Sequence, residues 1–235
     1  MTSLIQIPEH RIFSHFPNIA FNVVALAASM GGLKAISAVL SALPADFPAA
    51  ILVVQHLCPK FPSQMAEILS QRTALRVKLA AIGDVVRPGT VYVAPPDQHL
   101  LVAPNGTLLL SDTPKMNFAR PAADKLFMSV ASTYKSRAIA VVLTGKGSDG
   151  ALGVLSIKKH GGMAIAQDES TSEFFNMPGA AIATGKVDLV LPLDAIASTL
   201  VHVVREQFAV TPRQRRGVTA RYFSLGNVSL TMSTL

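Results

Sequence analysis

The chain has 235 residues, of which half are apolar, and a formal net charge of +7. That length can form one domain of about 200 residues with a substantial core. No apolar run approaches the ~18 residues that a membrane-spanning helix requires, and Glu9, His10 and Arg11 stand where a signal peptide would have its apolar core. A single cysteine, Cys58, excludes an internal disulfide and fits a reducing compartment, so we expect a cytoplasmic protein without membrane insertion.

The positive charge is concentrated at the carboxyl end of the chain. From Arg205 onward there are five arginines and one acid, Glu206, so this stretch contributes five minus one, or +4, of the +7. We predict a basic, solvated and poorly ordered tail over 207–235. An acidic partner would suit such a tail, whereas no nucleic-acid-binding motif accompanies it, and we expect no nucleic-acid partner.

Strands and helices alternate along the chain after an irregular arm at 1–20, which Pro8 and Pro17 interrupt. Short apolar runs predict buried strands, and apolar residues at helical spacing predict the helices that follow them. Strands are expected at 22–28, 49–54, 138–143, 163–167 and 189–191, and helices at about 33–43, 61–69, 121–134, 151–160, 178–184 and 194–206. This order predicts an α/β domain over 21–206 with a doubly wound, mostly parallel sheet flanked by helices.

The segment 77–112 departs from this alternation. It contains short expected strands at 77–81, 90–94, 100–103 and 107–110, with the turn signal Asn105-Gly106 between the last two. We predict that this segment forms an antiparallel excursion at one edge of the sheet.

Ser29 lies in a tight turn between the first strand and the first helix. Gly31 and Gly32 follow it and allow the helix to begin close to the end of the strand. Such a turn presents a serine hydroxyl beside the free N–H groups of a helix N-terminus, as in a nucleophile elbow. Because Ala27 stands where the G-x-S-x-G pattern has its first glycine, a helix N-cap remains the alternative role for Ser29.

Two further side chains follow strand ends, as Ser29 does. His56 comes just after the expected strand 49–54, and Asp149 lies in the connection after the strand 138–143. The carboxyl ends of parallel strands share one edge of the sheet, where ligands bind in such folds. A hydroxyl, an imidazole and a carboxylate are the groups needed to activate a serine as a nucleophile.

A competing interpretation uses the same connection. Gly145, Gly147 and Gly150 have the G-x-G-x-x-G spacing between a strand and a helix, and Asp168 ends the next strand, as in a dinucleotide-binding fingerprint. Against it, Asp149 would place a carboxylate where a pyrophosphate should bind. This alternative predicts a nicotinamide or flavin protein.

Several motifs in a fixed order carry a resemblance to a known family. They are Ala28-Ser29-Met30-Gly31-Gly32, Gln55-His56, Pro88-Gly89 to Ala94-Pro95 with Asp97 and His99, Arg120-Pro121 with Asp124 and Phe127, Leu143-Thr144-Gly145, Gly147-Ser148-Asp149-Gly150, Ala166-Gln167 and Met177-Pro178. Over about 23–204 the chain resembles the catalytic domain of the chemotaxis protein-glutamate methylesterases, the CheB family.

The resemblance implies roles for the three side chains: Ser29 as nucleophile, His56 as general base and Asp149 as its partner, with no metal and no cofactor. The implied reaction is hydrolysis of glutamate methyl esters on the cytoplasmic helices of chemoreceptors, and some members also deamidate glutamine. The backbone N–H groups of Met30 and Lys146 are expected to form the oxyanion hole. At these two positions the family usually has threonine and methionine, so a side-chain donor is lost at Met30.

The resemblance also implies expectations about regulation. Typical members carry an N-terminal receiver domain, whereas only about 20 residues precede the first expected strand here. We therefore expect an esterase without its own receiver domain, acting alone or controlled by a separate regulatory protein. A second alternative is a catalytically impaired adaptor that binds a receptor, in which the changes at Met30 and Lys146 reflect decay of the oxyanion site.

Overall fold

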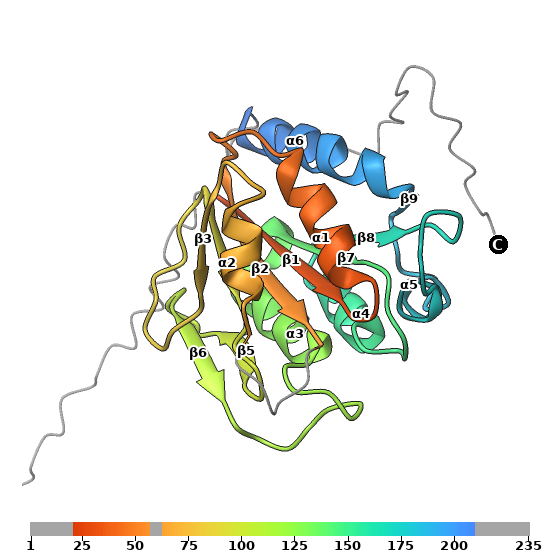
Figure 1. The fold of residues 1–235 in the computed structure, drawn as a ribbon, viewed down its shortest axis with the longest axis horizontal. Coiled ribbons are helices and arrows are strands. Elements are labelled where there is room, and N and C mark those ends of the chain that lie inside the picture. The colour runs from red at the N-terminus through yellow and green to blue at the C-terminus, as the bar shows by residue number, and fades with distance from the viewer. Residues whose placement is uncertain (1–20, 57–62, 210–235) are drawn as a thin grey trace, which may run out of the picture.

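The computed structural model describes residues 21–56 and 63–209, which form a sheet between two layers of helices (Figure 1). The strands of the sheet are β1 (Asn22–Ala28), β2 (Ala49–Gln55), β3 (Arg76–Leu79), β4 (Thr90–Val93), β7 (Ala138–Val142), β8 (Met163–Gln167) and β9 (Leu189–Leu191), and a separate hairpin consists of β5 (His99–Val102) and β6 (Leu108–Ser111). The helices are α1 (Gly32–Ser41), α2 (Met65–Ser70), α3 (Ala123–Tyr134), α4 (Ala151–Lys159), α5 (Asn176–Ile182) and α6 (Leu193–Ala209), and a 3-10 turn, η1 (Lys135–Arg137), leads into β7.

The seven strands have the order β3-β4-β2-β1-β7-β8-β9, and all neighbouring strands pair in parallel. After the central strand β1 the chain forms the strands on the β2 side of the sheet, and later in the sequence it forms those on the β7 side. The connections after β1 and β7 therefore diverge, and this is the switch point at which open α/β sheets bind ligands. The predicted α/β fold with a doubly wound, mostly parallel sheet is confirmed.

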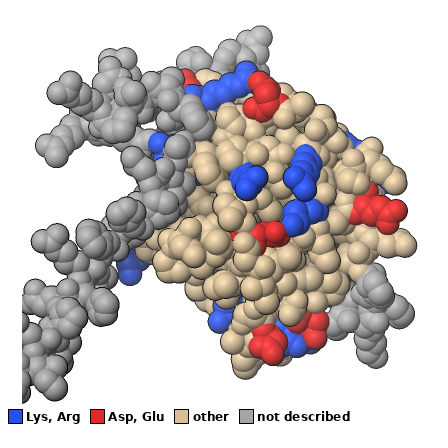
Figure 2. Space-filling model, turned by 90° about the vertical axis from the view of Figure 1, so that its left-hand side faces the viewer, with Lys and Arg blue, Asp and Glu red and all other residues tan. Residues whose placement is uncertain are grey.

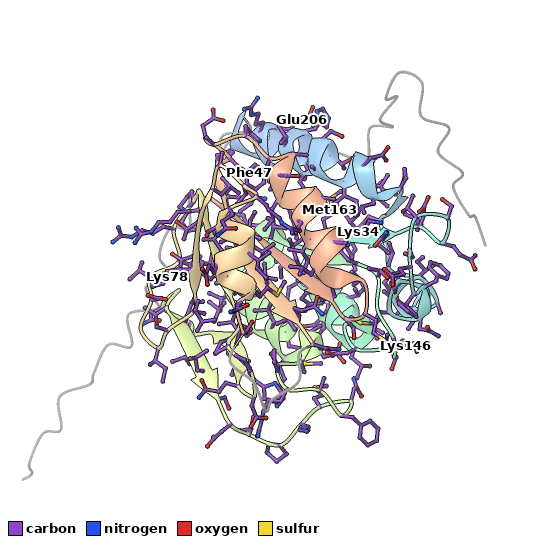
Figure 3. The ribbon with its side chains drawn as sticks, in the orientation of Figure 1. Lys34, Phe47, Lys78, Lys146, Met163 and Glu206 are labelled. Carbon is purple, nitrogen blue, oxygen red and sulfur yellow. The ribbon has the colours of Figure 1, made fainter. Side chains whose placement is uncertain are left out.

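The central strands of the sheet are buried on both faces because helices cover each of them. Every residue of β1 and β2 is buried, as expected for central parallel strands with continuous apolar runs. Val24 and Leu26 face a core shared with α1, α2 and α6, in which Phe47 is also buried (Figure 3). Val23 and Ala25 face a second core formed with α3, α4 and the β5–β6 hairpin.

One part of the predicted antiparallel excursion is wrong. β5 and β6 form the expected antiparallel hairpin, but β3 and β4 pair in parallel and extend the main sheet, with β4 between β3 and β2. The connection from β3 to β4 contains no helix. It turns at Gly83 and forms an isolated antiparallel bridge between Val85 and Thr107. A short strand carries no local signal for its direction, so the sequence pattern could not distinguish the two pairings.

The predicted elements end within a few residues of the observed ones, with one extension. α6 continues to Ala209, three residues into the tail predicted at 207–235, because no helix breaker occurs before Pro212. The arm at 1–20, the rest of the tail from 210, Cys58 and Phe61 lie outside the described residues.

The edge of the sheet at β3 exposes separate basic side chains rather than a continuous basic face (Figure 2). Acidic side chains lie beside several of them, and Lys78 pairs with Asp84 at 2.6 Å. Among the helices in the described ranges, none combines the length and apolar character needed to cross a bilayer.

Candidate active site

Ser29 directly follows β1 and starts the turn into α1. Its N–H donates to Thr144 O (3.0 Å), so the parallel pairing of β1 with the β7 side continues one residue beyond the strand. Gly31, with φ 78°, is the N-cap of α1 and no side chain caps this helix. Ser29 is therefore not an N-cap, and its partly exposed side chain lies at the carboxyl edge of the sheet.

His56 is the neighbour of Ser29 on the opposite side from Thr144. Ala28 and Gln55 are partners in the β1–β2 register, and the His56 N–H donates to Ala28 O (3.1 Å). Ser29 and His56 are thus the next residues of two adjacent parallel strands, whose backbones lie about 4.8 Å apart. The His56 side chain is 19 % exposed, which leaves the imidazole accessible at the edge.

The amide of Gln55 braces both backbone segments. Its Nε2 donates to Ser29 O (2.6 Å) and to His56 O (3.1 Å), and the side chain is buried. Gln55 reaches these carbonyls by passing over Gly32, where a Cβ atom would overlap its Oε1. The second glycine of the turn is therefore required by this amide.

Asp149 reaches His56 from the other side of β1. Its Oδ2 lies 2.8 Å from His56 Nε2, and the carboxylate is almost fully buried. Backbone N–H groups at the start of α3 hold the same carboxylate, Ala123 to Oδ2 (2.6 Å) and Asp124 to Oδ1 (3.0 Å). Because Asp149 occupies Nε2, the ring nitrogen Nδ1 is the one that remains for a reacting hydroxyl.

The structure thus brings the three predicted side chains to one edge and joins two of them by a direct bond. In residues 21–56 and 63–209, Ser29 Oγ makes no hydrogen bond, so the link between the hydroxyl and the imidazole is not closed. Hydrogen bonds of catalytic groups are often long without substrate and shorten in the complex.

Met30 and Lys146, the residues expected at the oxyanion hole, belong to two different connections. Met30 follows Ser29 in the chain, and Lys146 follows Gly145, on which a Cβ atom would lie 2.7 Å from Ser29 Cβ. Within the described part of the chain, neither backbone N–H donates to an acceptor. Lys146 lies at the rim beside α4 (Figure 3), with Nζ 5.0 Å from the centre of the Phe174 ring. Within residues 21–56 and 63–209 the Asp149 carboxylate bonds to His56 and to the start of α3, and Lys146 does not bond to it.

A hollow of about 380 Å³ opens beside Ser29. It is lined by the first turn of α1 together with Gln55 and Arg72, and Lys34 borders it. Lys34 and Arg72 are exposed, so positive charge surrounds the space next to the serine.

Two acidic residues near the site were not predicted as functional. Glu173 lies beside the turn after β1, because a Cβ atom on Gly31 would be 2.9 Å from its Oε2. Asp124 is fully buried behind Asp149, and burial together with the Asp149 charge raises the pKa of Asp124 to about 6. Glu173 carries no local signal in the sequence, whereas Asp124 is part of a motif on which the family resemblance rests.

The dinucleotide interpretation conflicts with the same geometry. A pyrophosphate would need the free N–H groups at the start of α4, but those of Gly150 and Gly153 already donate to the Asp124 carboxylate (2.9 and 2.7 Å). Asp168, the expected ribose ligand, is instead held within its own loop by Thr171 and Ser170.

The fold and the site define a class of α/β proteins in which a serine on a strand–turn–helix unit lies beside a histidine–aspartate pair. The chain belongs to the CheB methylesterase family, whose model matches residues 24–200. The family that the motifs resemble is thereby confirmed.

Solved and curated relatives agree with this membership. The chain is similar to the crystal structure of the Thermotoga maritima CheB methylesterase catalytic domain, with 41% identity and a TM-score of 0.75, covering 78% of this chain and 99% of that one. It is 42% identical over 191 residues to a protein-glutamate methylesterase/protein-glutamine glutaminase of Methanosarcina mazei, covering 78% of this chain and 52% of that protein. A protein of the same name from Pyrococcus abyssi is 45% identical over 184 residues, covering 77% of this chain and 50% of that protein. The chain spans about half the length of the curated relatives that it matches.

Proposed function

We propose that this chain is a serine hydrolase that removes methyl esters from glutamate side chains of chemoreceptors; its relatives are named protein-glutamate methylesterase/protein-glutamine glutaminase. The observation that carries the proposal is the bond between His56 Nε2 and Asp149 Oδ2 beside Ser29 at the carboxyl edge of the sheet. Deamidation of glutamine is a second reaction that the same groups support, since amide and ester carbonyls are attacked in the same way. The substrate is the cytoplasmic helical region of the receptor, so the protein acts in the cytoplasm.

Each catalytic side chain has a defined part in the proposed reaction. Ser29 Oγ attacks the ester carbonyl while His56 Nδ1 takes its proton, and the imidazolium then protonates the leaving methoxide. Water, activated by the same imidazole, releases the glutamate product from Ser29. Asp149 holds the proton on Nε2 and stabilises the imidazolium that forms.

The oxyanion that forms on the carbonyl is stabilised by the backbone N–H groups of Met30 and Lys146. These donors belong to the first turn before α1 and to the connection before α4, so they approach the carbonyl from two sides. The basic residues around the hollow, Lys34 and Arg72, favour a protein substrate that carries acidic side chains near the ester.

The test is methanol release from a methylated receptor fragment. We expect Ser29→Ala and His56→Ala to lower turnover by at least about 1,000-fold, because each removes a group that acts in the reaction. Ser41→Ala and His160→Gln serve as controls, since both residues lie away from the site and their side chains bond to their own helices, to Ala38 O and Ser156 O. Unchanged turnover in the Ser29 and His56 variants would refute the proposal.

The impaired-adaptor alternative is separated from this proposal by a serine-reactive phosphonate. An active elbow serine is labelled at Ser29 and a pure adaptor is not. Control by a separate regulatory protein is a further part of the proposal, and its readout is a change in methanol release when that protein is added.

A further inference from the structure

The first turns of α3 and α4 are capped by each other's carboxylates. Asp149, which precedes α4, accepts the N–H groups of Ala123 and Asp124 at the start of α3. Asp124 Oδ1, in turn, accepts the N–H groups of Gly150 (2.9 Å) and Gly153 (2.7 Å) at the start of α4. The N-cap residues of both helices, Ala122 and Gly150, supply no capping side chain of their own. Free N–H groups at a helix start need acceptors, so each carboxylate supplies what the other helix lacks.

Close packing of the two helices makes this exchange possible. A Cβ atom on Gly153 would lie 2.5 Å from Phe127 Cβ, so the absence of a side chain lets α4 approach α3. Gly150 has φ 101°, a conformation that residues with side chains rarely adopt, and its N–H donates to Asp124.

Asp124 also has a third donor, because Asn117 Nδ2 donates to its Oδ2 (2.8 Å). All three of its hydrogen bonds come from neutral groups, and no basic side chain pairs with it in the described ranges. The carboxylate is fully buried, makes no contact with the hollow beside Ser29, and is not used by the proposed reaction. Two of its three donors, Gly150 and Gly153, follow Asp149 in the chain, and the third, Asn117, precedes α3.

We propose that Asp124 is a positioning residue: by binding the N–H groups of Gly150 and Gly153 it fixes the start of α4, and thereby keeps Asp149 Oδ2 on His56 Nε2. The inference rests on the proposed function for its effect on activity. Asp149 is bonded to α3 but belongs to the connection before α4, so it stays in place only while the two helix starts keep their relative position. A displacement of about 1 Å at a reacting group can cost about 100-fold in rate.

Three substitutions of Asp124 distinguish the effects of its acceptor oxygens, of its negative charge and of the position of its carboxylate. Asp124→Asn keeps an oxygen for the two glycine N–H groups and removes the charge, while the amide of Asn117 can turn to present its oxygen. Asp124→Ala removes the acceptor, and Asp124→Glu keeps the charge but moves the oxygens by one methylene. Asp188→Ala is the matched control: Asp188 also accepts a backbone N–H, that of Ala164 (2.7 Å), at the opposite edge of the sheet, and its ion pair with Lys158 (2.6 Å) lies at the other end of α4 from Asp149.

The kinetic readout is kcat and KM for methanol release, measured at a temperature where every variant is folded by circular dichroism. We expect Asp124→Ala and Asp124→Glu to lower kcat by about 100-fold with KM within about 3-fold, and Asp124→Asn to lower kcat by less than about 10-fold. The Glu variant provides the test if the Ala variant does not fold. A kcat of Asp124→Ala and Asp124→Glu equal to that of Asp188→Ala would overturn the proposal.

A second readout does not depend on activity. The His56 Nε2–H proton, hydrogen-bonded to Asp149, gives a low-field NMR signal that we assign by its loss in His56→Gln. The signal should persist in Asp124→Asn and Asp188→Ala and disappear in Asp124→Glu; its persistence in Asp124→Glu would contradict the positioning role. If the wild-type protein released no methanol, the proposed function would fail while this measurement would still decide on Asp124.

Discussion

Gly32→Ala tests the bracing of the site by Gln55. Gly32 is the first residue of α1 and has no left-handed φ, so helix propensity alone predicts that alanine there would stabilise the protein by up to about 1 kcal/mol. The structure predicts the opposite. The added Cβ would overlap Gln55 Oε1 and lie 2.9 Å from Gln55 Cδ and 2.6 Å from Ala28 Cβ.

The size of the effect follows from what Gln55 holds. It cannot move away without losing its bonds to Ser29 O and His56 O, which contribute roughly 0.5–1.5 kcal/mol each. Ala28 lies in the buried strand β1 and cannot yield, and overpacking of a core costs about 1–3 kcal/mol. With the propensity gain subtracted, we expect the free energy of unfolding to fall by about 1–5 kcal/mol.

The measurement is urea-induced unfolding of the wild type and Gly32→Ala, with methanol release as the second readout. Gly179→Ala is the control, because its new Cβ would meet only the ring of Phe175, at 3.2 Å or more, inside helix α5. Turnover of Gly32→Ala should fall together with stability, since the carbonyls of Ser29 and His56 lose their common donor. A Gly32→Ala protein as stable and as active as the wild type would refute the bracing role of Gln55.

Two further predictions concern charge. Burial lowers the pKa of His99, whose Nδ1 accepts the Ala122 N–H (3.2 Å), so the unfolded chain binds its proton more readily and stability falls as the pH drops below about 6.5. His99→Asn keeps an acceptor for the Ala122 N–H but does not titrate. Urea unfolding between pH 5 and 7.5 should therefore show a smaller loss of stability at low pH in His99→Asn than in the wild type, and equal pH slopes in the two proteins would contradict the reasoning. The raised pKa of Asp124 changes stability in the opposite direction, but equally in both proteins. Glu173→Gln removes a negative charge beside Gly31, near the developing oxyanion, and should raise kcat/KM a few-fold at low ionic strength and less in high salt; a decrease at low salt would count against the placement of the oxyanion hole.

The sequence was informative where a residue's role depends on its own strand. Continuous apolar runs gave β1, β2 and β7 because strands buried on both faces contain little else. Ser29, His56 and Asp149 could be placed at one edge because each follows a strand of a parallel sheet. The spatial neighbour of each side chain was harder to predict from the sequence, since only the strand register places His56 beside Ser29.

Features that depend on two distant segments could not be predicted in this way. The direction of β3 is set by the path of its connection to β4, which the local pattern does not record. Asp124 reads in the sequence as an ordinary acidic residue in the first turn of a helix, where acids are favoured by the helix dipole. Its actual partners, Gly150 and Gly153, belong to another helix, and nothing in the spacing of these residues identifies the pairing.

The two carboxylates behind His56 connect stability to the proposed chemistry. A buried carboxylate is costly unless hydrogen bonds compensate for its lost hydration, and Asp149 obtains this compensation from α3 as well as from His56. The Asp149 carboxylate lies at the positive end of the α3 dipole and is bonded there before any substrate binds, so the group that holds the His56 imidazole is already in place. The same bonds fasten α3 to the connection before α4. The group that orients the histidine is therefore also part of the packing between two helices, and the site is as rigid as that packing.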